Sequence, residues 1–361
     1  MKTSKMKRRI RTVKTLCFAF AGVFAALVVV AIVGWSMFGE QILAARTVEQ
    51  IDEGLYTMAY DGEYGFGEFL EQGGAATDGE LAAYLADYIS HGFYQLNPKE
   101  QTYGCSTLAV TSADGQTLFG RNFDWTTCRV MIVKTVPKEG YASISTCNLD
   151  FLGFDESWSP TGSFMDQMMT LAAVYVPLDG MNEKGLCVAD LVIEDGTETH
   201  QDNGKTDLTT TAAIRLLLDR AANVDEALAL LQNYDMHSSS GMQHHLALAD
   251  ASGRRVVVEY INNVMYCTET PAVTNFYLTP GDHYGKGDAS SKNRYDRLMF
   301  QYALKEGRMT GQTLMDTLLS VEQNKPEEYR ATQWNVIYDT RSLTAFYRVH
   351  GKDVGEISIV K

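Results

Sequence analysis

A hairpin pattern in the first half of the chain constrains its fold more than any other feature. Cys105 begins an apolar run (108–110) that is typical of a strand. Asp114-Gly115 predicts a two-residue turn, and the return strand then carries Arg121 and Asp124. Because a hairpin brings its open ends together, we expect a thiol, a guanidinium and a carboxylate at one edge of a sheet. A nearby cation lowers the pKa of a thiol, and the thiolate is its reactive form.

The hairpin also carries a family resemblance. Cys105, together with the block Phe-Gly-Arg-Asn-Phe-Asp-Trp at 119–125, resembles the start of the catalytic chain in the choloylglycine hydrolase family of N-terminal-nucleophile hydrolases. Arg121 and Asp124 follow Cys105 by 16 and 19 positions, as in that family. The resemblance extends over about residues 105–350. It implies an α+β fold, a four-layer αββα sandwich, with 105–361 as the catalytic domain.

The resemblance implies hydrolysis of linear amides that are not peptides, by a cysteine that autoproteolysis exposes as a new N-terminus. The α-amino group of Cys105 would then act as the base, since its ordinary pKa of ~7.7–8.0 lies close to the ~8.5 of a cysteine thiol. Asp124 would orient that amine, and Arg121 would stabilise the thiolate. The alternative for these two residues is an ordinary ion pair at a strand end.

Three further residues are expected at the site because their local context resembles that of the family. Asn182, within Asp-Gly-Met-Asn-Glu-Lys-Gly-Leu, is expected to donate to the tetrahedral oxyanion. Its alternative is a turn asparagine. Asn275 and Arg294 match the family's second Asn and second Arg. Their alternatives are a strand-end asparagine and a surface arginine at a helix N-terminus.

The substrate class stays open at this level. Bile-acid conjugates, penicillin V and N-acyl lipids are all substrates of the family. The 104 residues before the nucleophile resemble the layout of the acid ceramidase and acylethanolamine amidase group, whereas Asn-Glu-Lys-Gly-Leu is similar to the bile-salt branch. An acyltransferase on the same site and a non-catalytic surface binding protein are the competing functions. We expect no cofactor, and no metal because none of the seven histidines has zinc-site spacing.

The N-terminal segment predicts a membrane anchor. Residues 1–15 contain seven basic residues and no acid, and an apolar stretch of 23 residues covers 16–38. This pattern predicts a cytoplasmic tail, a transmembrane signal anchor and an extracytoplasmic body. A cleaved signal peptide, giving a secreted protein, and a buried core helix are the alternatives.

The charge of the chain limits its partners. After residue 38 the chain has 24 basic residues against 45 acidic ones, so a nucleic-acid partner is not expected. We expect a small-molecule amide with an apolar acyl group as the partner.

Four cysteines besides Cys17 and Cys105 would form two disulfides or stay unpaired, and the size of the domain favours unpaired thiols. They are Cys128, Cys147, Cys187 and Cys267.

Residues 39–104 form a pre-segment, either a propeptide or a small subunit. Thr77 and Glu80 form a capping box for an amphipathic helix from 78 to about 90. The aromatic stretch before it (56–69) is too apolar for a disordered linker, so we expect the pre-segment to pair non-covalently with 105–361. The later sequence predicts a loop over 155–169 and helices near 209–222, 223–231, 294–304 and 313–321. It predicts strands near 131–136, 142–146, 187–193, 245–249, 256–260, 264–267, 272–278, 334–338 and 344–349.

Overall fold

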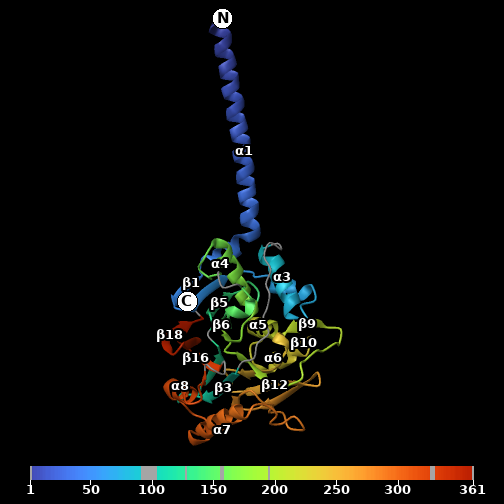
Figure 1. Ribbon diagram of the computed structural model, residues 1–361, viewed down its shortest axis with the longest axis vertical. Coiled ribbons are helices and arrows are strands. Elements are labelled where there is room, and N and C mark those ends of the chain that lie inside the picture. The colour runs from blue at the N-terminus through green and yellow to red at the C-terminus, as the bar shows by residue number, and fades with distance from the viewer. Residues whose placement is uncertain are drawn as a thin grey trace.

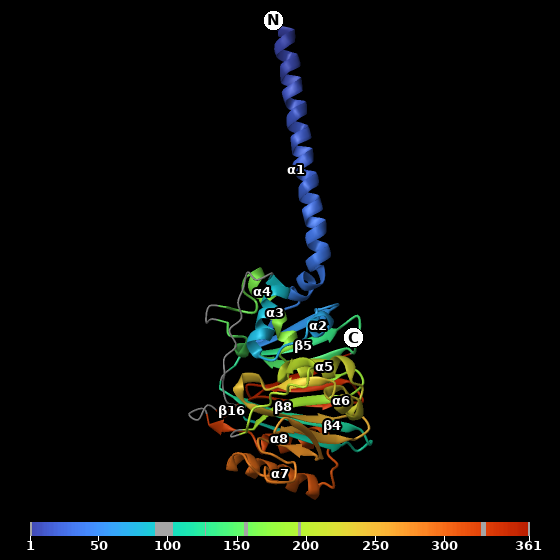
Figure 2. The same cartoon turned by 90° about the vertical axis from the view of Figure 1, so that its right-hand side faces the viewer.

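The chain folds around two stacked β-sheets that are covered by helices on their outer faces (Figures 1 and 2). The computed structural model describes residues 2–90, 104–126, 128–154, 158–193, 196–325 and 330–359. Within these ranges sheet 1 has nine strands in the order β1-β2-β5-β6-β7-β8-β11-β12-β13, and sheet 2 has the path β14-β3-β4-β16-β17-β18 with β15 paired to β16. A two-stranded parallel ladder joins β9 to β10.

The elements have the following bounds. The strands are β1 Glu49–Asp52, β2 Leu55–Asp61, β3 Gly104–Thr111, β4 Thr117–Trp125, β5 Val130–Val136, β6 Ser143–Asn148, β7 Asp179–Asn182, β8 Cys187–Ile193, β9 Thr206–Thr209, β10 Tyr234–His237, β11 Gln243–Ala249, β12 Arg255–Ile261, β13 Val264–Glu269, β14 Ala272–Val273, β15 Asn324–Lys325, β16 Arg330–Asp339, β17 Thr344–Val349 and β18 Lys352–Ser358. The helices are α1 Lys2–Ala45, α2 Phe66–Glu71, α3 Asp78–Ser90, α4 Phe164–Thr170, α5 Thr210–Arg220, α6 Val224–Leu231, α7 Ala289–Leu304 and α8 Gly311–Leu319. Single 3₁₀ turns are η1 Leu149–Leu152, η2 Leu171–Tyr175 and η3 Ser239–Gly241.

Three buried clusters hold the layers together. The central cluster lies between the sheets and combines Phe123 and Trp334 of sheet 2 with Leu191 and Val257 of sheet 1. A second cluster joins the outer face of sheet 1 to α5 and η2, and a third joins sheet 2 to α7 and α8. Apolar residues alternate between the two faces of each strand because successive side chains point to opposite sides. The described residues therefore form the αββα layering that the family resemblance implies.

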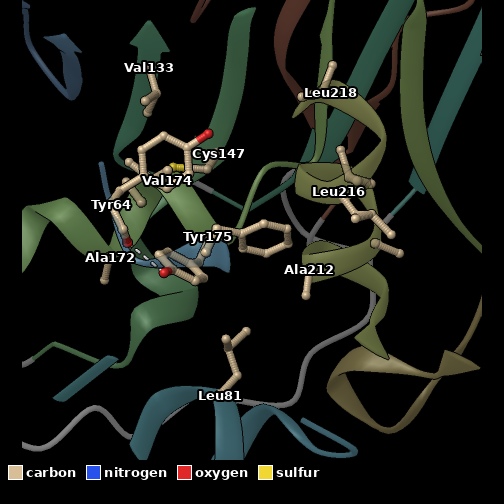
Figure 3. Close-up of a cluster of buried hydrophobic side chains, with 14 of the residues drawn as sticks. Tyr64, Leu81, Val133, Cys147, Ala172, Val174, Tyr175, Ala212, Leu216 and Leu218 are labelled. Atoms are coloured by element: carbon tan, nitrogen blue, oxygen red, sulfur yellow. Dashed lines mark hydrogen bonds between the residues drawn. The ribbon is translucent and has the colours of Figure 1, made fainter. Parts of the chain in front are cut away.

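The pre-segment is part of the sandwich. Strand β2 pairs in parallel with β5, which makes β1 and β2 the edge of sheet 1. The hydroxyl of Tyr64 donates to Asp219 on α5 at 2.6 Å, and the hydroxyl of Tyr175 donates to the carbonyl of Tyr64 at 2.6 Å. Figure 3 shows Tyr64 and Tyr175 in the same buried cluster as Leu81 of α3. Residues 49–90 thus pack against the segments that follow Cys105.

The helices partly match the expectations from sequence. Thr77 accepts from the amide of Glu80 at the start of α3, and Asn223 accepts from Glu226 at the start of α6. The loop predicted over 155–169 is wrong over its second half, where α4 begins behind a capping box of Ser163 and Asp166. That box was hidden in sequence by the Trp- and Met-containing context. Strands β9, β10 and β18 were not predicted.

The N-terminal helix α1 projects from the body (Figure 1). In the part of the chain that is described, no single helix is both long and apolar enough to cross a membrane. The segments Phe20–Ser36 and Phe38–Ala45, bent by 74° relative to each other, satisfy that requirement only as a pair, by length and composition alone. The transmembrane helix predicted over 16–38 is therefore not supported, because the described segment Phe20–Ser36 does not meet the requirement by itself.

Candidate active site

The β3–β4 hairpin places Cys105 between the two sheets. Antiparallel pairing sets Cys105 opposite Phe123 and Gly104 opposite Asp124. The side chain of Cys105 is fully buried, and Nη2 of Arg121 donates to its Sγ at 3.3 Å. The hairpin predicted from Asp114-Gly115 thus brings the thiol, the guanidinium and the carboxylate to one region of sheet 2.

Arg121 is fixed in position by sheet 1. Its Nε lies 2.8 Å from a carboxylate oxygen of Asp179, and both side chains are fully buried. Its Nη1 donates to the carbonyl of Asp190 at 2.5 Å. Asp179 in turn accepts from Nε1 of Trp334 and the hydroxyl of Tyr338. The guanidinium therefore bridges the two sheets. Asp179 lies in the same motif as Asn182, but the sequence did not predict it as a site residue.

The thiol of Cys105 is neutral in this state. Burial raises its pKa to about 12, because desolvation outweighs the favourable charge of Arg121, and the charge of Asp124 adds to the increase. Burial also raises the pKa of Asp179, although Arg121 and its hydrogen bonds oppose that effect. The charge of Arg121 is thus not sufficient to ionise the thiol of Cys105 while that side chain is fully buried.

Asn275 and Arg294 bracket the backbone of Cys105. The amide nitrogen of Cys105 donates to Oδ1 of Asn275 at 2.8 Å. Nη1 of Arg294 donates to the carbonyl oxygen of Cys105 at 2.7 Å, and its Nη2 donates to Oδ1 of Asn275 at 2.8 Å. Asn275 is itself held by Val192, whose carbonyl accepts from Nδ2 at 2.7 Å. These two expected residues therefore converge on the backbone of Cys105.

Asp124 is held by three side chains. Gln323 and Thr332 donate to its two carboxylate oxygens at 2.8 and 2.6 Å, and Arg294 lies 3.5 Å away. Gln323 and Thr332 were missed in the sequence because nothing in their local context marks them. They reach Asp124 only through the pairing of β16 with β4.

Gly104 occupies a position without room for a side chain. An ideal Cβ there would lie 2.5 Å from Nε2 of Gln323 and 3.3 Å from a carboxylate oxygen of Asp124. The residue before Cys105 is thus packed directly on the carboxylate of Asp124.

Asn182 does not lie with the other site residues. Its Nδ2 donates to the carbonyls of Leu218 and Ala221 at 3.0 and 2.8 Å, and its Oδ1 accepts from the amides of Lys184 and Leu186. Strand parity explains this arrangement. Asp179 and Met181 face the space between the sheets, so Asn182 faces the helical layer on the other side. Asn182 is therefore a turn asparagine in this structure, and its side chain is hydrogen-bonded on the side of the sheet that faces away from Cys105.

Among the described residues, no cluster of three or more His, Cys, Asp or Glu side chains has the geometry to hold a metal ion. The cysteines at 105, 128, 147, 187 and 267 are free thiols, and four of them are buried.

Comparison with known proteins agrees with this geometry. Residues 105–275 match the family described as "Linear amide C–N hydrolases, choloylglycine hydrolase family". A curated relative, the bile salt hydrolase/transferase of Clostridium perfringens, is 26% identical over 183 residues, which cover 46% of this chain and 54% of the relative. The aligned stretch thus spans about half the length of that relative.

Solved structures share the fold. A mutant of the conjugated bile acid hydrolase from Clostridium perfringens superposes with a TM-score of 0.52 at 19% identity, covering 70% of this chain and 92% of that one. A second variant of the same enzyme gives a TM-score of 0.52 at 17% identity, covering 71% and 92%. The fold is thus that of these hydrolases over about 70% of the chain. By the family match, residues 105–275 belong to the choloylglycine hydrolase family of linear amide C–N hydrolases.

Proposed function

We propose that this protein hydrolyses a linear, non-peptide amide through Cys105, after the peptide bond between Gly104 and Cys105 has been cleaved. The observation that carries the proposal is the convergence of Arg121, Asn275 and Arg294 on Sγ, N and O of Cys105. An ordinary buried cysteine does not have its side chain and both backbone polar atoms bound by separate side chains.

Cleavage would begin with attack of Sγ on the carbonyl carbon of Gly104. The C–N bond breaks as the C–S bond forms, and the amide nitrogen of Cys105 gains a proton. Water then hydrolyses the thioester to release the carboxylate of Gly104 and a free thiol. Asp124, packed against Gly104, is placed to orient the resulting α-amine.

Turnover would use that amine as the base. The amine accepts the proton of the thiol, Sγ attacks the substrate carbonyl, and the amine part of the substrate leaves with the proton. Water then hydrolyses the thioester. The pKa of about 12 applies to the thiol of Cys105 in the uncleaved chain. Departure of Gly104 would admit water to the site and so lower the cost of desolvating the thiolate. Arg121, 3.3 Å from Sγ, would then stabilise the thiolate.

The oxyanion requires a donor other than Asn182. Asn275 is the side-chain amide that touches Cys105, and we infer that its Nδ2 takes this role once a substrate occupies the site. Asn182 keeps its place in the fold, because its four hydrogen bonds close the turn after β7 and the end of α5.

The test combines intact mass with an assay of amide hydrolysis. We expect a fragment that begins at Cys105, and we expect Cys105→Ala to abolish both cleavage and hydrolysis. Cys105→Ser should retain at most slow cleavage, because a hydroxyl is the weaker nucleophile at neutral pH. An active enzyme that stays in one piece would exclude the α-amine as base.

Acyl transfer to an amine is the second candidate function, since the curated relative is named as a hydrolase and a transferase. The same acyl-enzyme would pass its acyl group to an amine in place of water. Product analysis with glycine or taurine added as the acceptor separates hydrolysis from acyl transfer.

The extracytoplasmic location expected from the basic N-terminal segment stays a prediction. Protease accessibility in intact cells would test it.

A further inference from the structure

A buried glutamate holds the segment that carries Asn275. Glu259 lies on β12, and its side chain is fully buried. Its Oε1 accepts from the amide nitrogen of Leu278 at 2.8 Å, and its Oε2 accepts from that of Thr279 at 2.7 Å. One carboxylate therefore fixes the backbone just after Asn275, the side chain that binds the amide of Cys105.

This segment needs such a partner because it is buried outside the strands. Strand β14 ends at Val273, and residues 274–279 are each more than nine-tenths buried. Buried backbone amides require hydrogen-bond partners, and outside a ladder those partners must come from elsewhere. The amide of Asn275 donates to Oγ of Ser291 at 2.6 Å, and Glu259 takes the amides at the other end of the segment. Asn275 is thus held from α7 on one side and from β12 on the other.

His245 holds the carboxylate of Glu259 in turn. The two residues are directly opposite each other in the pairing of β11 with β12, and Nδ1 of His245 lies 3.0 Å from Oε1. Both side chains are fully buried. Burial acts to raise the pKa of Glu259, but the hydrogen bond and charge of His245, together with the hydrogen bonds from the segment, outweigh it, so this pKa lies below its ordinary value. The group is a carboxylate, which only accepts, so Nδ1 of His245 carries the proton.

We propose that Glu259 is a positioning residue for amide hydrolysis: it holds residues 274–279 so that the side chain of Asn275 stays against Cys105, and His245 keeps the carboxylate in place. The assignment rests on the proposed function, in which Asn275 donates to the oxyanion. Release of the segment would move this donor away from the position of the oxyanion, and a misplacement of about 1 Å can cost about 10²-fold in rate.

The first test removes the charge and one acceptor from Glu259. Glu259→Gln keeps the shape of the side chain, but its amide nitrogen cannot accept from the backbone of Thr279. The assay uses whichever of glycocholate, penicillin V and N-decanoylglycine the wild type hydrolyses fastest. We expect kcat to fall by about tenfold or more and KM to stay within about twofold, because the lost interaction belongs to the transition state. Glu269→Gln, the same change at an exposed glutamate of β13, is the matched control and should alter neither constant. A wild-type kcat in Glu259→Gln would overturn the assignment.

A double variant shows whether Glu259 acts through Asn275. In the Asn275→Ala background, Glu259→Gln should change kcat by less than about twofold, since the side chain that it positions is already absent. If the two single effects instead multiply, Glu259 acts independently of Asn275 and the assignment is wrong.

Variants of His245 cover the case in which Glu259→Gln does not fold. His245→Leu removes the donor to the carboxylate, whereas His245→Asn, of nearly the same shape, offers a side-chain N–H near the position of Nδ1. We expect kcat to fall by about threefold or more in His245→Leu and to be largely restored in His245→Asn. Equal kcat values in the two folded variants would contradict the assignment.

Hydrogen exchange separates this assignment from the proposed function. Mass spectrometry of the peptide that contains residues 274–279 should show exchange about tenfold faster or more in Glu259→Gln, and exchange at the wild-type rate in Glu269→Gln. If the wild-type protein hydrolyses no amide but exchange follows this pattern, the proposed function falls and the hold of Glu259 on the segment stands. If amides are hydrolysed and exchange in Glu259→Gln is that of the wild type, the assignment of Glu259 falls alone.

Discussion

The amide nitrogen of Cys105 donates to Oδ1 of Asn275 at 2.8 Å, across 170 positions of sequence. The same oxygen accepts from Arg294, which also binds the carbonyl of Cys105. The backbone of Cys105 is therefore positioned by side chains that follow β14 in the chain, and not by its own hairpin alone. Substitutions at Asn275 should be felt at the reacting atoms.

The two asparagines expected at the site should behave differently on substitution. Asn275→Ala should lower turnover by about 10²–10³-fold, the usual cost of removing an oxyanion donor. Asn182→Ala should leave turnover of the folded enzyme nearly unchanged but lower the free energy of unfolding by roughly 1–3 kcal/mol, since buried groups lose their partners. Steady-state kinetics and chemical denaturation measure the two effects. A large loss of turnover in Asn182→Ala alone would return the oxyanion role to that residue.

A side chain at position 104 should slow cleavage. The Cβ of Gly104→Ala would meet Gln323 at 2.5 Å and disturb the hydrogen bond that this side chain donates to Asp124. We expect the cleavage rate to fall about tenfold, which corresponds to roughly 1.4 kcal/mol of barrier. Appearance of the fragment by mass spectrometry gives the rate. Gly79→Ala, at an exposed position of α3 where a Cβ would make only an ordinary contact 3.8 Å from Oγ1 of Thr77, is the control and should cleave at the wild-type rate.

Local patterns in the sequence predicted the part of the site that local structure builds. Arg121 and Asp124 reach Cys105 through one two-residue turn, so the spacing within a single hairpin was enough. Residues that arrive from distant segments were harder to predict. Gln323 and Thr332 lie 199 and 208 positions from Asp124, and only the pairing of β16 with β4 brings them together.

Asn182 shows why a motif alone can misplace a residue. Its segment resembles the family's sequence, yet the face of a strand on which a side chain lies depends on strand register, which a short motif does not fix. A shift of one residue in the register moves a side chain from the space between the sheets to the face that packs on the helices. Asp179, three positions earlier in the same segment, faces the site and binds Arg121.

The stability of the fold should depend on pH through His244. Both ring nitrogens of this buried residue face oxygen atoms, with Nδ1 2.8 Å from Asp190 and Nε2 2.8 Å from the carbonyl of Ser239. Burial acts to lower the pKa of His244, but the charge and hydrogen bond of Asp190, together with Ser239 and the charge of Asp78, outweigh it. The pKa therefore lies above the ordinary 6.5.

The sign of the effect follows from that direction. A histidine whose pKa is raised by folding contributes stability that is complete below its unfolded pKa and is lost as the pH rises through the folded one. The melting temperature of the wild type should thus fall, relative to that of His244→Gln, as the pH rises above 6.5. Thermal unfolding at pH 6 and pH 8 measures the difference. A profile in His244→Gln identical to that of the wild type would exclude the pairing of His244 with Asp190 as the cause of the pH dependence.

The pre-segment should stay bound to the catalytic chain after cleavage. Strand β2 is hydrogen-bonded to β5, and Tyr64 donates to the buried Asp219, which also pairs with Arg215 at 2.6 Å. Each large apolar side chain that the pre-segment buries contributes roughly 1.5–3 kcal/mol. The described residues contain no disulfide across this contact, so packing and hydrogen bonds alone must hold it.

Gel filtration of the cleaved protein tests this association. Salt at 1 M should leave both fragments in one peak, because screening acts mainly on exposed charges and this contact is buried. Mild urea should separate them before the catalytic fragment unfolds. Tyr64→Ala removes a buried ring and its hydrogen bond to Asp219, so it should lower the urea concentration needed for separation. Glu71→Ala, at an exposed position of α2, should not. Separation of the wild-type fragments in buffer alone would make the pre-segment a discarded propeptide.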